Sequence, residues 1–127
     1  MAEEKTIVVV DDNPDIVSIV RTILEGRGYS VISAYSGEEL FARLEERKPD
    51  LIILDIMMPN MDGLQVLTRL KGVPDTASIP VILLTAKVQY EDVLGGYKLG
   101  ADYYITKPFT STQLINGINL LLGEEKA

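Results

Sequence analysis

Five short runs rich in valine and isoleucine alternate along this chain of 127 residues with stretches whose apolar residues recur at helical spacing. The predicted strands are Ile7 to Val10, Tyr29 to Ala34, Leu51 to Leu54, Val81 to Leu84 and Tyr103 to Ile105. Three of the runs are continuously apolar, which is typical of strands buried on both faces of a sheet. Because helices separate the strands, we expect an α/β fold in which a five-stranded parallel sheet forms the middle of three layers.

The predicted helices follow the strands in turn. In the first, Asn13 is the expected N-cap and Pro14 the first helical residue, and Gly26 and Gly28 end it. The second predicted helix carries Leu40, Phe41 and Leu44, and the third carries Leu64, Val66, Leu67 and Leu70. A weaker fourth helix runs from about Tyr90 to Leu99 and contains Gly95 and Gly96. The last, Thr112 to Leu122, carries Leu114, Ile115, Ile118, Leu121 and Leu122. With no repeat or linker in sight, we expect one domain over residues 1–127, with its core at about 5–122.

The composition excludes several functional classes. The sequence contains no cysteine and no histidine, which removes disulfides, thiolate metal sites, Ser-His triads and histidine-based zinc enzymes. Its formal net charge of −7 argues against nucleic acid as a direct partner, because phosphate binding needs clustered Lys and Arg. The acidic start of the chain is unlike a signal peptide, and no run approaches the ~20 apolar residues of a membrane helix. We therefore expect a cytoplasmic protein.

Polar side chains follow four of the five predicted strands. Asp11 and Asp12 follow the first strand, Asp55 the third, Thr85 and Ala86 the fourth, and Thr106, Lys107 and Pro108 the fifth. In open α/β sheets the ligand site lies at the carboxyl ends of the strands, where the strand order reverses. A flavodoxin-like (βα)5 sandwich with strand order 2-1-3-4-5 would bring these residues into one pocket, and the second strand, which supplies no acid, would lie out of reach.

The charges of that pocket point to a metal ion. Three carboxylates close together repel one another, and Lys107 supplies a single positive charge. A hard divalent cation with oxygen ligands would relieve the repulsion, and Mg²⁺ suits such a set better than a transition metal. A metal beside a lysine and a hydroxyl is typical of phosphoryl transfer, and carboxylates do form acyl phosphates. Asp55, which follows the apolar run Leu51 to Leu54, is the expected nucleophile.

Each of these residues also has a purely structural interpretation. Asp11 and Asp12 could cap the first helix, Asp62-Gly63 could be a turn and cap, and Thr85 could be a cap as well. Lys107 could be a solvated surface residue. The functional interpretation rests on the convergence of several strand ends rather than on any one residue.

Over about residues 5 to 122 the sequence resembles the receiver domains of bacterial response regulators, including those of the chemotaxis-regulator type. The segments that carry the resemblance are Val8 to Asp12, Leu54 to Pro59, Met61-Asp62-Gly63, Leu84-Thr85-Ala86, Gly100-Ala101-Asp102 and Lys107-Pro108-Phe109. As a set, in this order and spacing, they are highly specific.

The resemblance implies roles for individual residues. Asp55 corresponds to the phosphoacceptor, and Asp11 and Asp12 to the acids that hold Mg²⁺, one directly and the other through water. Met57 would bind the metal through its backbone carbonyl. Thr85 would hydrogen-bond the phosphoryl oxygens, with Ala86 keeping their approach open. Lys107 would pair with the phosphoryl group, and the Lys107–Pro108 peptide bond would be cis. The Tyr104 side chain would move between exposed and buried positions.

The resemblance also implies partners and an output. A histidine kinase or histidine phosphotransfer protein would supply the phosphoryl group, and a downstream protein or output domain would respond to the surface formed by about Tyr90 to Leu99, Tyr103 to Ile105 and Thr112 to Leu122. Two features depart from DNA-binding regulators that dimerise through this surface: Tyr103 stands where an aspartate is frequent, and Thr112 to Leu122 carries no charge. Such a chain is expected to act as a signalling phosphoacceptor rather than an enzyme, either alone or as part of a longer regulator.

Three other functions are alternatives for a chain with these residues. An aspartyl-nucleophile phosphatase of the haloacid-dehalogenase type needs a second acid two residues after the nucleophile, where this chain has Met57. A flavodoxin-like electron carrier needs a phosphate-binding loop after the first strand, where Asp11 and Asp12 would repel the flavin phosphate. A pseudo-receiver scaffold, which binds partners without phosphorylation, usually lacks one of the acid, hydroxyl or lysine positions.

Overall fold

The five predicted strands form one parallel sheet. The computed structural model describes residues 5–56, 58, 63–85 and 100–123, and of Thr85 the backbone only. The strands are β1 (Thr6–Val10), β2 (Ser30–Ala34), β3 (Leu51–Leu54), β4 (Val81–Thr85) and β5 (Tyr103–Thr106), in the order β2-β1-β3-β4-β5. The strand prediction is therefore correct to within one residue at each end, and the flavodoxin-like α/β fold with order 2-1-3-4-5 is confirmed.

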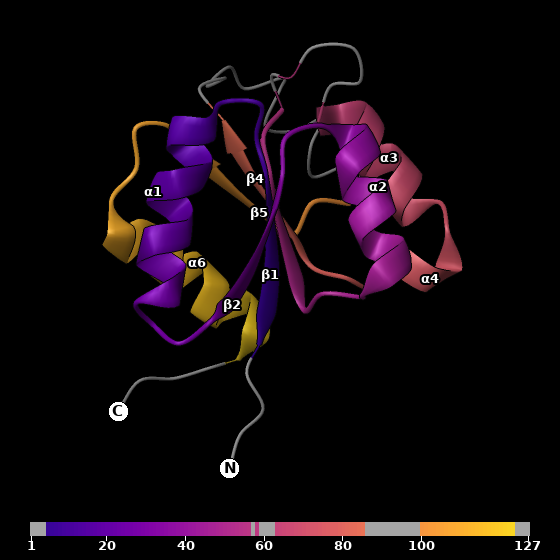
Figure 1. Ribbon diagram of the computed structural model, residues 1–127. Helices are drawn as coiled ribbons and strands as arrows, with labels where there is room; N and C mark the ends of the chain where they lie inside the picture. Colours follow the sequence, from indigo (N-terminus) through magenta and orange to yellow (C-terminus); the bar gives the residue numbers. More distant parts are fainter. Residues whose placement is uncertain (1–4, 57, 59–62, 86–99, 124–127) are drawn as a thin grey trace.

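The described helices lie on both faces of this sheet. They are α1 (Pro14–Glu25), α2 (Gly37–Glu46), α3 (Gly63–Lys71), the short α4 (Pro74–Ala77) and α6 (Ser111–Leu122). Figure 1 shows the sheet nearly edge-on, with α1 and α6 on one side and α2, α3 and α4 on the other. The three layers expected from the alternating pattern are thus present.

Two apolar clusters hold the layers together, one on each face of the sheet. Alternate residues of a strand point to opposite faces, so Ile7 and Val9 of β1 join the cluster under α1 and α6, while Val8 and Val10 join the cluster under α2 and α3. All four are at most 1% exposed. Burying a side chain of this size contributes roughly 1.5–3 kcal/mol, which explains why the central strands are apolar at every position.

Side-chain caps fix where several helices begin. The Asn13 side chain accepts from the backbone N–H of Asp15, with Pro14 in the first turn, so the predicted start of α1 is confirmed. Ser36 caps α2 in the same way through Glu39. Gly26 ends α1, and Gly28 follows in a left-handed conformation with φ of +90°, where a side chain would be strained.

The sequence prediction and the structure differ between β3 and β5. The four-residue helix α4 was not predicted, because a single turn begun by Pro74 has no room for an apolar period. The predicted helix from about Tyr90 to Leu99, with Gly95 and Gly96, lies outside the described residues. Among the described helices, none has the length and apolar character needed to cross a membrane.

A network of hydrogen bonds ties the start of β4 to the segment that leads into β5. The Lys71 ammonium group donates to the carbonyl oxygens of Ala77 and Ile79 at 3.1 and 2.9 Å and lies 3.5 Å from Oδ2 of Asp102. The same carboxylate oxygen accepts from the N–H of Val81 at 2.9 Å. Asp102, whose sequence motif does not indicate this contact, therefore joins α3 to β4, and Lys71 adds α4 to the same network.

We expect Asp102→Ala to lower the free energy of unfolding by about 1–2 kcal/mol, because it leaves the Val81 N–H and the Lys71 ammonium group without this acceptor. The measurement is urea-induced unfolding followed by circular dichroism. Glu45→Ala, an exposed position on α2, is the matched control and should change stability by less than about 0.5 kcal/mol. Equal effects of the two substitutions would show that the network does not stabilise the fold.

Candidate functional site

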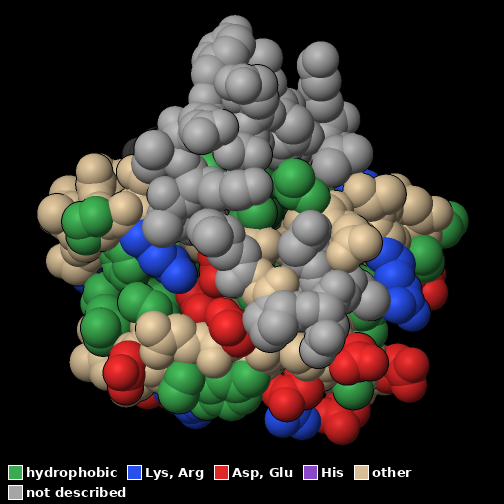
Figure 2. All heavy atoms as spheres, turned by 90° about the horizontal axis from the view of Figure 1, so that it is seen from above, with side chains coloured by type: hydrophobic (Ala, Val, Ile, Leu, Met, Phe, Trp, Pro, Cys, Tyr) green, Lys and Arg blue, Asp and Glu red, His purple; other side chains and the backbone are tan. Residues whose placement is uncertain are grey.

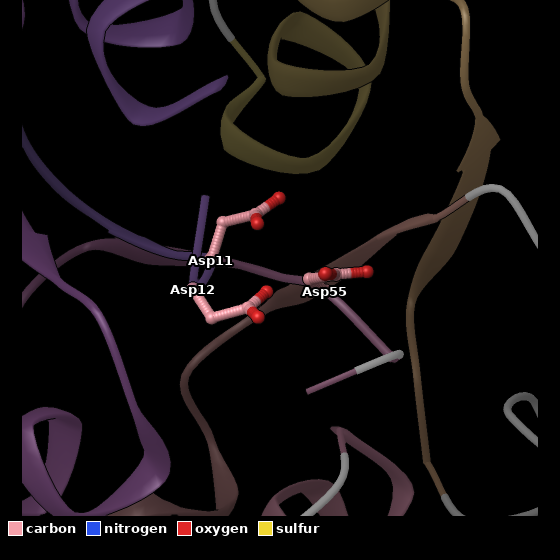
Figure 3. Close-up of side chains that lie close together, drawn as sticks. All are labelled: Asp11, Asp12 and Asp55. Carbon is pink, nitrogen blue, oxygen red and sulfur yellow. The ribbon is translucent and has the colours of Figure 1, made fainter. Parts of the chain in front are cut away.

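Three carboxylates meet where β1 and β3 end. Asp11 and Asp12 directly follow β1, and Asp55 directly follows β3. One carboxylate oxygen from each residue lies within 4.8 Å of the others. In Figure 3 the three side chains leave the ends of their strands toward a shared space. The convergence predicted from the order of the strands is therefore observed for all three acids.

The sheet itself fixes the backbone of the two inner acids. The N–H of Asp11 donates to the carbonyl oxygen of Ala34 at 3.1 Å, and the N–H of Asp55 donates to that of Val10 at 2.9 Å. Both residues thus continue the hydrogen-bond ladders of β1 with β2 and of β3 with β1. The carboxylate positions follow from the register of the sheet rather than from a flexible loop.

The environments of the three acids differ. Asp11 and Asp55 are 2% and 4% exposed, whereas Asp12 is exposed. Buried carboxylates need partners, since removing a charge from water is costly. Lys107 provides one: its Nζ lies 2.8 Å from Oδ2 of Asp11 and 3.6 Å from Oδ2 of Asp55. Lys107 is therefore part of the site and not a solvated surface residue.

The peptide bond between Lys107 and Pro108 is cis, which is the isomer that the resemblance implies. Lys107 follows β5, which lies at the far end of the sheet from β2. Figure 2, a view onto the end of the molecule where the strands finish, shows acidic side chains gathered near the middle of the face with basic side chains close by.

The capping interpretation of the acids applies only in part. The N-cap of α1 is Asn13, which accepts from the N–H of Asp15. Oδ1 of Asp11 accepts from the N–H of Asn13 at 2.9 Å, so this carboxylate also orders the turn into α1. The capping contact of α1 does not involve Asp12, and its exposed carboxylate faces the same space as the two buried ones.

The backbone at the start of α3 lies close to that of Asp55 and Ile56. The N–H of Gly63, at the start of α3, donates to the carbonyl oxygen of Ile56 at 2.8 Å. A Cβ atom at Gly63 would lie 2.5 Å from the Cα atom of Ile56 and would overlap the carbonyl oxygen of Asp55. The sequence predicts a turn and cap at Asp62-Gly63 but not this close approach, for which the glycine itself is the available signal.

The remaining predicted site residues are placed only in part. Met57, Ala86 and Asp62 lie outside the described residues. For Thr85 the backbone is described: it pairs with Thr106 at the end of β4 and β5, which is the strand end expected for it. Tyr104 is half-buried against the apolar cluster under α2 and α3.

The donor set suits a hard divalent cation. Three carboxylates and one ammonium group carry a formal excess of negative charge, and their oxygens are the ligands that Mg²⁺ prefers. Because the chain contains no histidine or cysteine, a metal site with imidazole or thiolate ligands is excluded. The arrangement of acids and lysine can stabilise the charged oxygens of a phosphoryl group beside Asp55.

Comparison with known proteins agrees with this chemistry. Residues 7–119 match the family model of the response regulator receiver domain. The alkaline phosphatase synthesis transcriptional regulatory protein PhoP of Bacillus subtilis (strain 168) is 42% identical over 118 residues, which are 93% of this chain and 48% of that protein. The chain thus spans about half the length of the curated relatives it matches.

Solved structures share the fold. The signal receiver domain of a signal transduction histidine kinase from Syntrophus aciditrophicus has a TM-score of 0.85 at 39% identity and covers 97% of this chain and 94% of its own. The chemotaxis protein CheY4 of Vibrio cholerae has a TM-score of 0.89 at 27% identity, with 94% and 99% covered.

We expect Gly63→Ala to destabilise the protein by about 1–3 kcal/mol, the usual cost of forcing an extra carbon into a packed site. The added methyl group must push the Asp55–Ile56 backbone away from α3, so divalent-cation binding should weaken as well. Chemical unfolding and a Mg²⁺ titration measure the two effects. Gly26→Ala, where the nearest atom to a Cβ is 3.3 Å away, is the control; similar losses in both variants would contradict the close-approach argument.

Proposed function

The chain belongs to the response regulator receiver domain family, and we propose that it takes a phosphoryl group from a histidine kinase or a histidine phosphotransfer protein onto Asp55. The observation that carries this proposal is the position of Asp55. Its carboxylate is buried at the end of β3, shares a space with Asp11 and Asp12, and lies 3.6 Å from the Lys107 ammonium group. A nucleophile in such a place is shielded from water and held beside positive charge.

Asp11, Asp12 and Asp55 would hold Mg²⁺, together with the backbone carbonyl of Met57. The support is the excess of negative charge in an all-oxygen donor set. When bound, the ion neutralises charge on the phosphoryl oxygens and on the acids around them. It would also stabilise the folded chain, since it binds the folded state alone.

The transfer itself exchanges one bond for another. A carboxylate oxygen of Asp55 attacks phosphorus in line, the phosphorus–nitrogen bond of the phosphohistidine breaks, and the leaving imidazole takes up a proton. Lys107 moves its ion pair from Asp11 and Asp55 toward the phosphoryl oxygens. The Thr85 hydroxyl would donate to one of these oxygens, and the small Ala86 leaves room for their approach.

Phosphorylation would be passed on through Tyr104 and the surface formed by residues about 90–99, 103–105 and 112–122. A tyrosine that is half-buried beside the apolar cluster can take up either of two positions at modest cost. A protein or an output domain would respond to this surface, whereas the net charge of −7 disfavours direct binding to nucleic acid. The proposed setting is a single receiver domain acting as a signalling phosphoacceptor in the cytoplasm, not as an enzyme with a separate substrate.

Asp55→Asn is expected to abolish phosphorylation without unfolding the protein, because the amide keeps the shape of the carboxylate but is a poor nucleophile. The measurement is intact mass after incubation with acetyl phosphate and Mg²⁺. The wild type should gain the mass of one phosphoryl group and the variant none. Asp75→Asn, an exposed position on α4, is the control, and undiminished phosphorylation of Asp55→Asn would assign the acceptor elsewhere.

Asp12→Ala is expected to weaken Mg²⁺ binding at least about tenfold, a loss of roughly 1.4 kcal/mol. Without metal the same variant should be slightly more stable, by roughly 0.5 kcal/mol, because one member of a repelling group is gone. Calorimetric Mg²⁺ titration and thermal unfolding with and without the ion test both effects. Asp15→Ala, an exposed acid in the first turn of α1, should leave Mg²⁺ affinity unchanged; equal affinities of wild type and Asp12→Ala would rule out Asp12 as a ligand.

A further inference from the structure

The strand β2 leaves one side of its backbone open. It lies at the end of the strand order and pairs with β1 alone among the described strands. In Figure 1 it is the foremost strand and runs between α1 and α2. Edge strands present backbone N–H and C=O groups that another extended segment can pair with.

The register shows which backbone groups face outward. The N–H of Ser30 and the carbonyl oxygen of Ala34 bond to the β1 side, at Lys5 and Asp11. Because successive residues of a strand turn their backbone groups to opposite sides, Val31 and Ser33 face away from β1. These two residues form the open edge of the sheet.

Two arginines from different helices reach the same point on this edge. Arg21 of α1 donates from Nη1 to the Ser33 hydroxyl oxygen at 3.1 Å, and Arg43 of α2 donates from Nε to the Ser33 carbonyl oxygen at 3.4 Å. Arg21 is also paired with Glu25 at 3.0 Å, one turn further along α1. A guanidinium group has five N–H donors, so both arginines keep donors for a further partner.

The edge is the floor of a groove with an excess of positive charge. Its lining residues include the three arginines Arg21, Arg43 and Arg47 and a single acid, Glu46. Tyr35, which is 43% exposed, lies at its end. A basic groove is unexpected in a chain with a net charge of −7, and none of the proposed phosphorylation residues contributes to it.

We propose that this groove binds an extended acidic segment of a partner protein. The main chain of that segment would pair with Val31 and Ser33 as a sixth strand, and its carboxylates would bond to Arg21, Arg43 and Arg47. Arginine matches carboxylate geometry with two parallel hydrogen bonds. The open backbone edge favours a peptide over a nucleic acid, because a nucleic acid has no peptide backbone that could pair with β2 as a further strand.

A fluorescent peptide of about eight residues with alternating Glu and Val tests the proposal by fluorescence anisotropy on the full chain. We expect binding that weakens as salt is added, because the charges are exposed. The double substitution Arg43→Ala and Arg47→Ala should reduce the affinity at least about tenfold. The control is the double substitution Arg27→Ala and Arg69→Ala, which removes the same two positive charges outside the groove lining and should leave affinity unchanged.

Three further probes separate the alternatives. A Glu-Val peptide in which every backbone nitrogen is methylated has no N–H group to donate and should bind at least about tenfold more weakly; equal affinity would overturn the strand pairing. An oligothymidylate that bound as tightly as the Glu-Val peptide and lost binding in the double variant would overturn the choice of a peptide. If the wild-type chain formed a dimer and the double variant were monomeric, a second copy of the chain would be the occupant of the groove, and the choice of a partner protein would be overturned. Absence of Glu-Val binding above that of a Lys-Val peptide would overturn the proposal altogether.

Discussion

The rest of the structure depends on one interaction, the pairing of two buried carboxylates with a single ammonium group. Asp11 and Asp55 are almost wholly removed from water, and Lys107 lies within 3.6 Å of both. The three residues follow different strands, so the contact joins the beginning, the middle and the end of the chain. A parallel sheet brings such residues together because all its strands finish at one edge. The local excess of negative charge that remains is the reason for proposing that this edge binds a cation and a phosphoryl group.

The fold could be predicted from the sequence because burial on both faces leaves a clear pattern. The run Leu51 to Leu54 is buried at every position and is apolar at every position, and the same holds for Ile7 to Val10. The bounds of α1 follow from the cap at Asn13 and the glycine that ends it. The single turn α4 could not be predicted in this way, because it packs through backbone and hydroxyl contacts, such as that of Thr76 with Leu70, and not through an apolar period.

The site could be predicted to the extent that it depends on strand ends. Asp11, Asp12, Asp55 and Lys107 each follow a recognisable strand, so topology alone brings them together. Gly63 and Asp102 could not be assigned in the same way. Gly63 lies against the Asp55–Ile56 backbone, and Asp102 accepts from the N–H of Val81. Such contacts between distant segments leave no periodic pattern in the sequence. The sequence motifs marked both residues without indicating what they contact.

The backbone hydrogen bonds of Asp11 and Asp55 determine which local openings of the structure separate the site residues. Both amide groups belong to the ladders that join β1 to its neighbours, so the carboxylates cannot separate unless the centre of the sheet opens. Local openings of helices or of the outer strands, which cost less than global unfolding, leave the acids in place. The three acids should therefore separate only when the centre of the sheet opens, whereas local opening of β5 can remove Lys107 from them. The amide hydrogen of Asp55, which bonds to Val10 of β1 inside the sheet, should exchange with solvent as slowly as the slowest in the sheet, whereas that of Asp11, which bonds to Ala34 of the edge strand β2, should exchange faster.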